Sequence, residues 1–254
     1  MNKLINNINN LDLVNKTNEI ITYPTNGDFL PSGTVINVKL DGTGDFTTLA
    51  EALNYLNNKW SYGGVIILLD EGIHIVTSSI VVGAYITNSG RYFEFITIKG
   101  KGKDKTIVRN TGDSYCLRAA GNMPIHIYDL TFDNGTNTSK DCISVYEQGN
   151  LILDNTDFKN LRLACYAHSG GNILINSTVT YTNVATAFRA YAGTINMNFN
   201  VNVSFSSVTT AFQVGYGGII RGYHPNITYT NVTNKTSQAV GTATNNGWIA
   251  GITV

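Results

Sequence analysis

The chain has 254 residues, of which 43% are hydrophobic and 13% charged, and its formal net charge is zero. This composition suits one elongated domain with a polar, weakly charged surface. The charge is unevenly distributed, because all 17 carboxylates lie in residues 1–157, whereas residues 158–254 hold five Lys or Arg. Five cations are too sparse for a nucleic-acid groove, and no apolar stretch is long enough to span a membrane. We therefore expect neither a nucleic-acid partner nor membrane insertion.

Residues 1–34 are expected to form an N-terminal attachment segment and linker. Leu4, Ile8 and Leu11 recur at helical spacing, and a helix this short is marginal unless it packs on another surface. Prolines and glycines then mark an extended linker up to Gly33. The first residues lack the continuous apolar core of a signal peptide. This absence fits a protein made in a cytoplasm and released by lysis, and it also fits a secreted protein whose leader has been removed.

A strand and a glycine-rich turn precede a predicted helix of about residues 47–58. Thr47 or Thr48 is its expected N-cap, and Glu51 lies in its first turn, as in a capping box. An apolar stripe at helical spacing follows from Leu49, Leu53 and Leu56. After this helix the apolar residues alternate over short runs, which predicts strands at residues 65–69, 71–76, 95–102 and 106–108.

The C-terminal half carries a repeat of an aromatic residue, a small polar pair and an aliphatic residue. Four copies begin at spacings of 23, 24 and 24 residues, and an earlier copy begins at Phe132. One such unit cannot bury its own apolar face, so it must stack on its neighbours. A strand-only repeat of this length fits one rung, or turn, of a parallel β-helix; a β-sandwich is the competing interpretation. Stacked rungs would align an aromatic column and a bend column of amides: Phe132, Phe158, Tyr181, Phe205 and Tyr229; Asn160, Asn183 and Asn231, with Ser207 replacing one amide.

Three segments in residues 35–110 carry a family resemblance. D-G-T-G-D-F-T-T-L-A-E-A-L, G-G-V-I-I-L-L-D-E-G-I-H and I-T-I-K-G-K-G-K-D-K-T-I-V resemble the entry rungs of the pectate-lyase-like superfamily, in particular pectin methylesterases and phage tail-spike β-helices. The resemblance implies an all-β, right-handed, single-stranded parallel β-helix over residues 35–254. It also implies that the N-terminal helix caps the open end of the solenoid.

The catalytic motifs of the related enzymes are not matched. The glutamine motifs and the L-G-R-P-W segment of pectin methylesterases are absent. Ser139–Val145 resembles the D-D-C-I-S-I segment of polygalacturonases, but of its two acids only Asp141 is present. Inverting hydrolysis needs two carboxyl groups, and none follows residue 157. Any catalytic acids of a polysaccharide hydrolase or lyase would therefore lie in residues 129–157, with Asp141, Glu147, Asp154 and Asp157 as candidates. Whether the chain is an enzyme stays open, and the missing motifs favour a negative answer.

An outward-facing stripe is the second candidate site. Aligning the rungs by their glycines directs Ile143, Cys165, Phe188 and Phe212 inward. The opposite face then presents aromatic and hydrogen-bonding side chains that suit sugar rings and hydroxyl or acid groups, and that protein interfaces and plain β-sheet surfaces also favour. A glycan face, a subunit interface and an ordinary surface remain open at this point. The predicted ligand-binding residues are Arg118, Tyr146, Tyr166, His168, Arg189, Tyr191 and Gln213.

No cofactor or metal is expected, because no metal-site spacing is present. The leading hypothesis, from fold and resemblance, is a phage or prophage tail-spike or tail-fibre protein in the virion, made in the host cytoplasm. It would be a homotrimer that recognises a host-surface polysaccharide and attaches to a tail or baseplate protein through its N-terminus. A polysaccharide depolymerase, a purely structural virion component and an extracellular protein remain alternatives.

Overall fold

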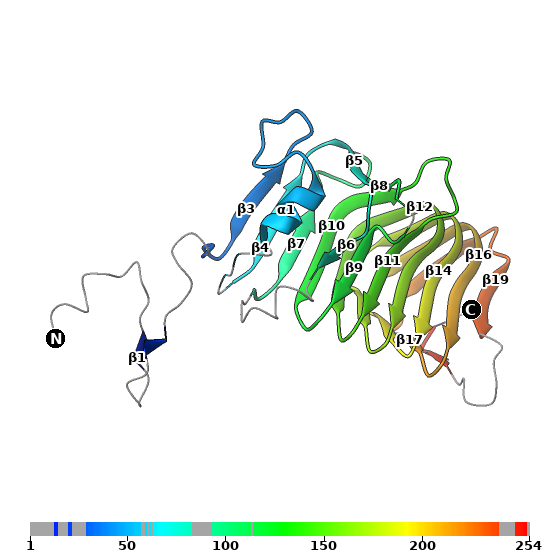
Figure 1. The fold of residues 1–254 in the computed structure, drawn as a ribbon. Helices are drawn as coiled ribbons and strands as arrows, with labels where there is room; N and C mark the ends of the chain where they lie inside the picture. Colours follow the sequence, from blue (N-terminus) through cyan, green and yellow to red (C-terminus); the bar gives the residue numbers. More distant parts are fainter. Residues whose placement is uncertain are drawn as a thin grey trace.

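The computed structural model describes residues 29–56, 59, 61, 63–82, 93–112, 114–238 and 247–252, together with strands β1 (Leu13–Val14) and β2 (Ile20–Ile21). From β3 (Thr34–Val38) onward, every paired strand lies parallel to its partner on the neighbouring rung. The molecule is a parallel β-helix with its rungs stacked along one axis (Figure 1). This confirms the prediction and excludes the β-sandwich.

Three sides of the solenoid follow from the pairing register. Strand segments one rung apart pair with one another on each side, so each side is one continuous parallel sheet. The first side runs from β3 to β20 through β4 (Val65–Leu69), β7 (Ile96–Lys99), the starts of β10 (Pro124–Asp133) and β12 (Asn150–His168), β13 (Asn172–Ile175), β15 (Thr194–Met197), β17 (Ile219–Gly222) and β20 (Trp248–Ala250).

The second and third sides share the long strands, which bend around the corner between them. The second side contains β5 (Gly72–Val76), β8 (Thr106–Asn110), the end of β10, the middle of β12, the starts of β14 (Val179–Tyr191) and β16 (Asn202–Gly215), and β18 (Asn226–Thr230). The third side contains β6 (Ile80–Val82), β9 (Leu117–Ala120), β11 (Asp141–Tyr146), the ends of β12, β14 and β16, and β19 (Asn234–Gln238).

The helix α1 spans Leu49–Leu56 and lies at the first rung. Its N-cap is Thr48, whose Oγ1 accepts a hydrogen bond from the Glu51 amide (3.2 Å), while Glu51 Oε2 accepts one from the Thr48 amide (3.0 Å). These bonds complete the predicted capping box. Leu49, Leu53 and Leu56 are buried and pack against the first strands of the solenoid. That the helix closes the open end stays a prediction.

The predicted aromatic column runs through the core. The register pairs Phe132 with Phe158, then Tyr181, Phe205 and Tyr229, one rung at a time. Successive rings are stacked with their centroids 5.1–5.4 Å apart. Such pairs contribute about 0.5–1.5 kcal/mol each beyond their burial. The repeat read from the sequence is therefore the packing repeat of the core.

The bend column lies at the corner between the second and third sides, and one step of the predicted amide ladder is present there. Asn160, Asn183, Ser207 and Asn231 all adopt positive φ, between 53° and 56°. Asn183 Nδ2 donates to Asn160 Oδ1 at 2.7 Å. A left-handed residue turns the chain within one position, and Asn tolerates this region better than most residues. Asn160 Nδ2 in turn donates to Asp133 Oδ1 at 2.7 Å, so side-chain hydrogen bonds link the first rungs of this column, and the later rungs share its backbone conformation.

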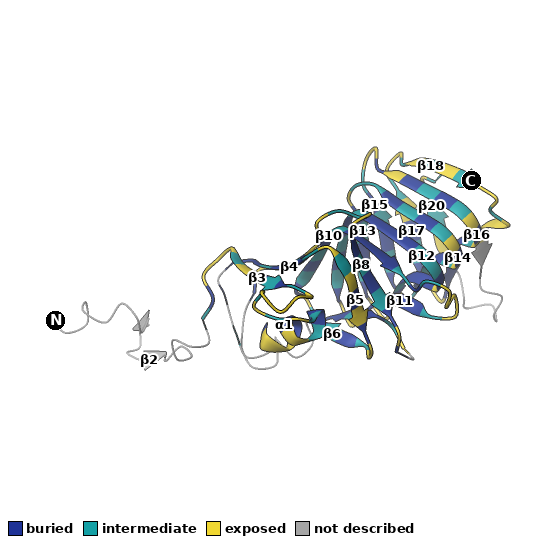
Figure 2. Ribbon diagram, turned by 90° about the horizontal axis from the view of Figure 1, so that it is seen from above, coloured by how far each residue is buried: buried dark blue, intermediate teal, exposed yellow. Residues whose placement is uncertain are grey.

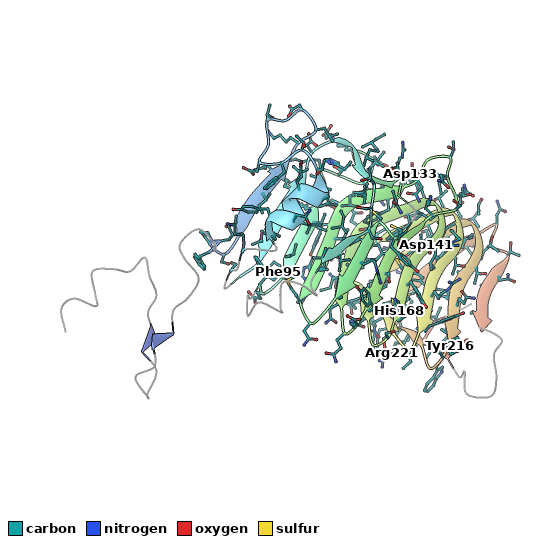
Figure 3. The ribbon with its side chains drawn as sticks, viewed as in Figure 1. Phe95, Asp133, Asp141, His168, Tyr216 and Arg221 are labelled. Carbon is teal, nitrogen blue, oxygen red and sulfur yellow. The ribbon has the colours of Figure 1, made fainter. Side chains whose placement is uncertain are left out.

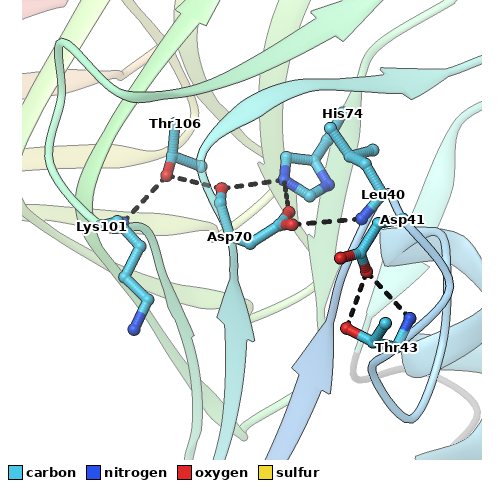
Figure 4. A network of polar contacts seen from close by, with 7 residues as sticks. All are labelled: Leu40, Asp41, Thr43, Asp70, His74, Lys101 and Thr106. Carbon is cyan, nitrogen blue, oxygen red and sulfur yellow. Dashed lines mark hydrogen bonds and ion pairs between the residues drawn. The ribbon is translucent and has the colours of Figure 1, made fainter.

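The entry rungs are joined by a polar network (Figure 4). His74 Nε2 lies 3.1 Å from the backbone oxygen of Asp70, and Asp70 Oδ2 accepts from the Leu40 amide at 3.2 Å. Thr106 Oγ1, one rung later, donates to the same Asp70 backbone oxygen at 2.9 Å. Asp41 Oδ1 accepts from the Thr43 amide and closes the glycine-rich turn. These hydrogen bonds connect residues on successive rungs, so the segments that carry the family resemblance help to hold the entry rungs together.

Several predictions concern residues with no described counterpart. The proposed helix at Leu4, Ile8 and Leu11 lies outside the described residues. Strands β1 and β2 form an antiparallel pair with each other. The division of the chain at residue 34 stays a prediction.

Among the described residues, no helix has the length and apolarity needed to cross a membrane. The three cysteines are buried and free, and burial raises the pKa of Cys116 and Cys165 to about 12.

Candidate ligand-binding face

The predicted outward stripe lies on the third side of the solenoid. Along this side the register aligns Arg118, Ser144, Tyr166, Arg189 and Gln213 in one column. His168 and Tyr191 pair in the next column, two residues further along their strands. We call this set the aromatic–arginine face; it comprises Arg118, Tyr146, Tyr166, His168, Arg189, Tyr191 and Gln213, all partly exposed.

Strand alternation explains why these side chains face outward. Ile143, Cys165, Phe188 and Phe212 pair in register on the same strands, and each is fully buried. Residues directly after them in the chain point to the opposite face of the sheet. The buried and partly exposed bands along these strands are visible in Figure 2. The inward and outward assignment made from the glycine register is therefore confirmed.

An aromatic stack forms the middle of the face. The His168 ring lies parallel to that of Tyr146, with centroids 5.5 Å apart and 7° between the planes. The same imidazole lies 4.5 Å from the Tyr166 ring, and Tyr166 meets Tyr191 edge-on at 5.9 Å. His168 Nε2 is also 3.0 Å from the hydroxyl of Ser144. These contacts hold the rings in fixed positions on a rigid sheet.

The two arginines are held against these rings. The Arg118 guanidinium carbon lies 4.6 Å from the Tyr146 ring centroid. The Arg189 guanidinium carbon lies 5.7 Å from both the Tyr166 and Tyr191 centroids. Arg189 Nε donates to Gln213 Oε1 at 2.5 Å, which fixes the plane of its fork. Cation–π contacts of this kind contribute about 0.5–2 kcal/mol, more where water is excluded.

Burial shifts the protonation of the face toward neutral rings. Burial, and then the positive Arg118, lower the pKa of His168, against a smaller opposite effect of Glu147. Burial also raises the pKa of Tyr166, which Arg189 opposes. A charged form loses solvation when buried, so the neutral imidazole and phenol are favoured. At neutral pH the charge of the aromatic–arginine face therefore comes from its arginines.

Sequence reasoning missed three members of this surface. Tyr115 stacks on Tyr166 at 6.5 Å, and Tyr216 contacts Tyr191 at 5.2 Å. Figure 3 shows Tyr216 and His168 on the same flank of the solenoid, away from Asp133. Ser144 was findable, because it is one register position from both Arg118 and Tyr166. Tyr115 lies outside the regular strands, and Tyr216 is in a turn beside Gly217. Strand alternation therefore does not predict which way either side chain faces.

The four candidate catalytic acids are not brought together. Asp141 lies at the start of the third-side strand β11, Asp154 at the end of a first-side segment, and Asp157 on the second side. Glu147 is exposed in the turn after β11. The three aspartates have partners: Arg162 binds Asp141 with two hydrogen bonds of 2.7 Å, Asn176 Nδ2 donates to Asp154 at 3.0 Å, and Lys103 lies 3.1 Å from Asp157.

A concave region lies at the opposite end of the solenoid. A pocket of about 340 Å³ borders the first strand, β3, and the glycine-rich turn. Its walls combine apolar and polar groups, and its one carboxylate, Asp45, accepts a hydrogen bond from the Asn37 amide at 2.7 Å. None of the predicted site residues lines this pocket. Its lining residues are Leu30, Thr34, Val35, Ile36, Asp45, Phe46 and Tyr55.

Comparison with known proteins adds no family assignment. No family model matches the chain, and neither the curated proteins nor the solved structures contain a match. The parallel β-helix is established by the structure, whereas the resemblance to the pectate-lyase-like superfamily and to phage tail spikes stays a prediction from the sequence segments.

Proposed function

We propose that this chain is a receptor-binding protein of the phage tail-spike type, and that its aromatic–arginine face binds a polysaccharide of the host cell surface. The observation that carries the proposal is the continuous set of contacts from Arg118 over Tyr146, His168 and Tyr166 to Arg189. Rings that are apolar on their faces and polar at their edges suit sugars. A β-helix is compatible with this function, although a fold alone does not fix one.

The proposal extends to assembly and location. The protein forms a homotrimer in the virion, is made in the host cytoplasm, and attaches to a tail or baseplate protein through residues 1–34. The exposed Trp248, which is 68% accessible on the last described strand of the first side, supports contact with another chain. Large exposed aromatic residues are enriched at protein interfaces. Light scattering on the full chain tests this part: a threefold mass is expected, and a monomer at all concentrations contradicts it.

The binding proposal is tested by retention of the full chain on immobilised host-surface polysaccharides. Tyr166→Ala and Tyr191→Ala are each expected to weaken binding by roughly tenfold, as interface residues of this kind do. Tyr223→Ala is the matched control, because Tyr223 is 54% exposed in a turn after β17. Equal loss in all three variants, or no retention of the unmodified chain, contradicts the proposal.

The same samples distinguish a depolymerase from a binder. Incubation of the chain with the retained polysaccharide is followed by assays for new reducing ends and for unsaturated sugars. The paired, separated carboxylates favour binding without turnover. Turnover that disappears in Asp141→Asn or Asp157→Asn would instead assign the chain to the depolymerase class.

A further inference from the structure

We infer that the polysaccharide is anionic, and that the guanidinium groups of Arg118 and Arg189 each bind one of its oxyanion groups. The inference rests on the proposed function and specifies its ligand. The shared chemistry is a carboxylate, phosphate or sulfate oxygen pair, which the planar fork of arginine binds with two parallel hydrogen bonds. The evidence begins with ion pairing: Arg109 and Arg162 are paired with carboxylates, whereas Arg118 and Arg189 have no carboxylate partner among the described residues.

Six other cations, two of them arginines, are paired with carboxylates. Arg162 forms a two-bond pair with Asp141, Arg109 lies 3.9 Å from Asp133, and Lys103 lies 3.1 Å from Asp157. Within the described parts of the chain, neither Arg118 nor Arg189 has such a partner. Both nevertheless lie on a partly buried aromatic surface, where an unpaired charge is less well solvated than in water. An anion supplied by a ligand would compensate each of them.

The donors of the two forks are available. Arg118 Nε is buried and has no hydrogen-bond partner among the described groups, so the donors that a ligand can reach on this side chain are its terminal nitrogens. In Arg189 the only hydrogen bond to described protein uses Nε, toward Gln213, so the terminal nitrogens remain for a ligand. The aromatic contacts hold both guanidinium planes before binding. Preorganised donors lose less freedom on binding than mobile ones.

The surroundings contain little competing negative charge. Residues 158–254 contain no Asp or Glu. Two acids lie nearby: Asp141 is bound by Arg162, and Glu147 is exposed at the turn and close enough to act on the pKa of His168. Tyr115, at the edge of the face, has its pKa raised to about 12 by burial and by Asp141, so its phenol is neutral. The net field over the face is therefore positive.

The register fixes the separation of the two strand positions that carry the forks. The register steps from Arg118 to Ser144, Tyr166 and then Arg189, which is three strand spacings. At about 4.8 Å per spacing the two positions are roughly 14 Å apart along the axis. Tyr146, His168 and Tyr166 occupy the interval. This arrangement fits an extended polymer that runs parallel to the solenoid axis, with sugar rings on the aromatic stack and an oxyanion at each end.

The experiment measures retention of the full chain on matched pairs of polymers. Alginate and polygalacturonate are each compared with their carboxyl-reduced forms, and dextran sulfate and a dextran phosphate with unmodified dextran. We expect retention on anionic members and weak or no retention on their neutral counterparts, with retention falling as salt rises. The carboxylate, sulfate and phosphate arms identify which oxyanion is preferred. Equal retention on anionic and neutral members overturns this inference but leaves the proposed function intact, whereas no retention on any polymer counts against both.

The variants Arg118→Gln and Arg189→Gln locate the anion sites. Each removes one fork, and we expect roughly 10- to 100-fold weaker binding, in the range of a charge-assisted hydrogen bond. Arg189→Lys keeps the charge without the fork and is expected to be intermediate. Arg221→Gln is the matched control, because Arg221 is exposed on the first-side strand β17. Thermal melting shows that each variant is folded. Unchanged binding in both glutamine variants, or an equal loss in Arg221→Gln, overturns the assignment.

Discussion

The second and third sides of the solenoid share the strands β12, β14 and β16 but present different surfaces. On the second side Asp157 lies between Lys103 and Lys159, and Asp133 lies close to Arg109, so charge is compensated inside the protein. On the third side, Arg118 and Arg189 contact rings rather than carboxylates. A regular backbone therefore allows ion pairs to neutralise the charges on one side, while Arg118 and Arg189 on the neighbouring side stay available to a ligand. Both sides pack on one hydrophobic core, so the difference between them lies in their outward residues.

The largest effect on stability is expected in the aromatic column of the core, on which both sides pack. Tyr181 is fully buried and stacks on Phe158 and Phe205. Tyr181→Ala should lower the free energy of unfolding by about 3–5 kcal/mol, because a large cavity opens in the column. Denaturant unfolding measures this. Tyr181→Phe keeps the ring and removes only the hydroxyl, 3.6 Å from Cys165 Sγ, so it should cost about 1 kcal/mol or less. Equal losses would show that the hydroxyl, and not the stack, is what matters.

The corner between the sides comes next. Asn183 has φ of 55° and donates to Asn160. Asn183→Ala removes this bond and strains the backbone, so we expect a loss of about 1–2 kcal/mol in unfolding free energy. Asn183→Gly enters the left-handed region without strain and should lose less. Alanine and glycine variants of equal stability would contradict a strained corner.

A smaller effect is expected from the ion pairs of the second side. Asp157→Asn removes the charge between Lys103 and Lys159, whose side chains are 27% and 35% exposed and can be hydrated. The expected cost is about 1 kcal/mol, typical of a partly exposed pair. Polysaccharide retention should be unchanged, since this residue is on the other side of the corner. A large loss of binding in this variant would break the contrast between the two sides.

The smallest effect concerns pH on the third side. The folded pKa of His168 lies below its unfolded value of about 6.5, first because of burial and then because of Arg118. The unfolded chain thus takes up a proton at a higher pH, and stability contributed by His168 is fully present above about pH 6.5 and declines toward the folded pKa. Unfolding from pH 7.5 to 5 should therefore show a shallower decline in His168→Gln. The pKa of His126 is also lowered by burial, so some decline remains in the variant. Identical pH profiles would contradict the assignment.

Much of the fold follows from the period of the sequence. Stacked rungs place equivalent residues in register, so a repeat of Phe158, Tyr181 and Phe205 predicts the aromatic column directly. The outward face follows from the same register and from strand alternation. The positions of the acids could not be obtained this way. Asn155 and Asn160 both have positive φ, so each turns the chain and resets the alternation. Asp154 and Asp157 consequently fall on different sides although only three residues apart.

The one-residue corner has a further consequence for how such a chain can change over time. Asn160, Asn183, Ser207 and Asn231 form the turn between the second and third sides without an intervening loop. Adding a residue at this point would shift every following side chain of the rung to the opposite face. Duplication of a complete rung, in contrast, preserves the register and lengthens the third side by about 4.8 Å. Whole-rung duplication or deletion is therefore the change by which descendants of this sequence can match polymers of a different repeat length while their cores stay the same.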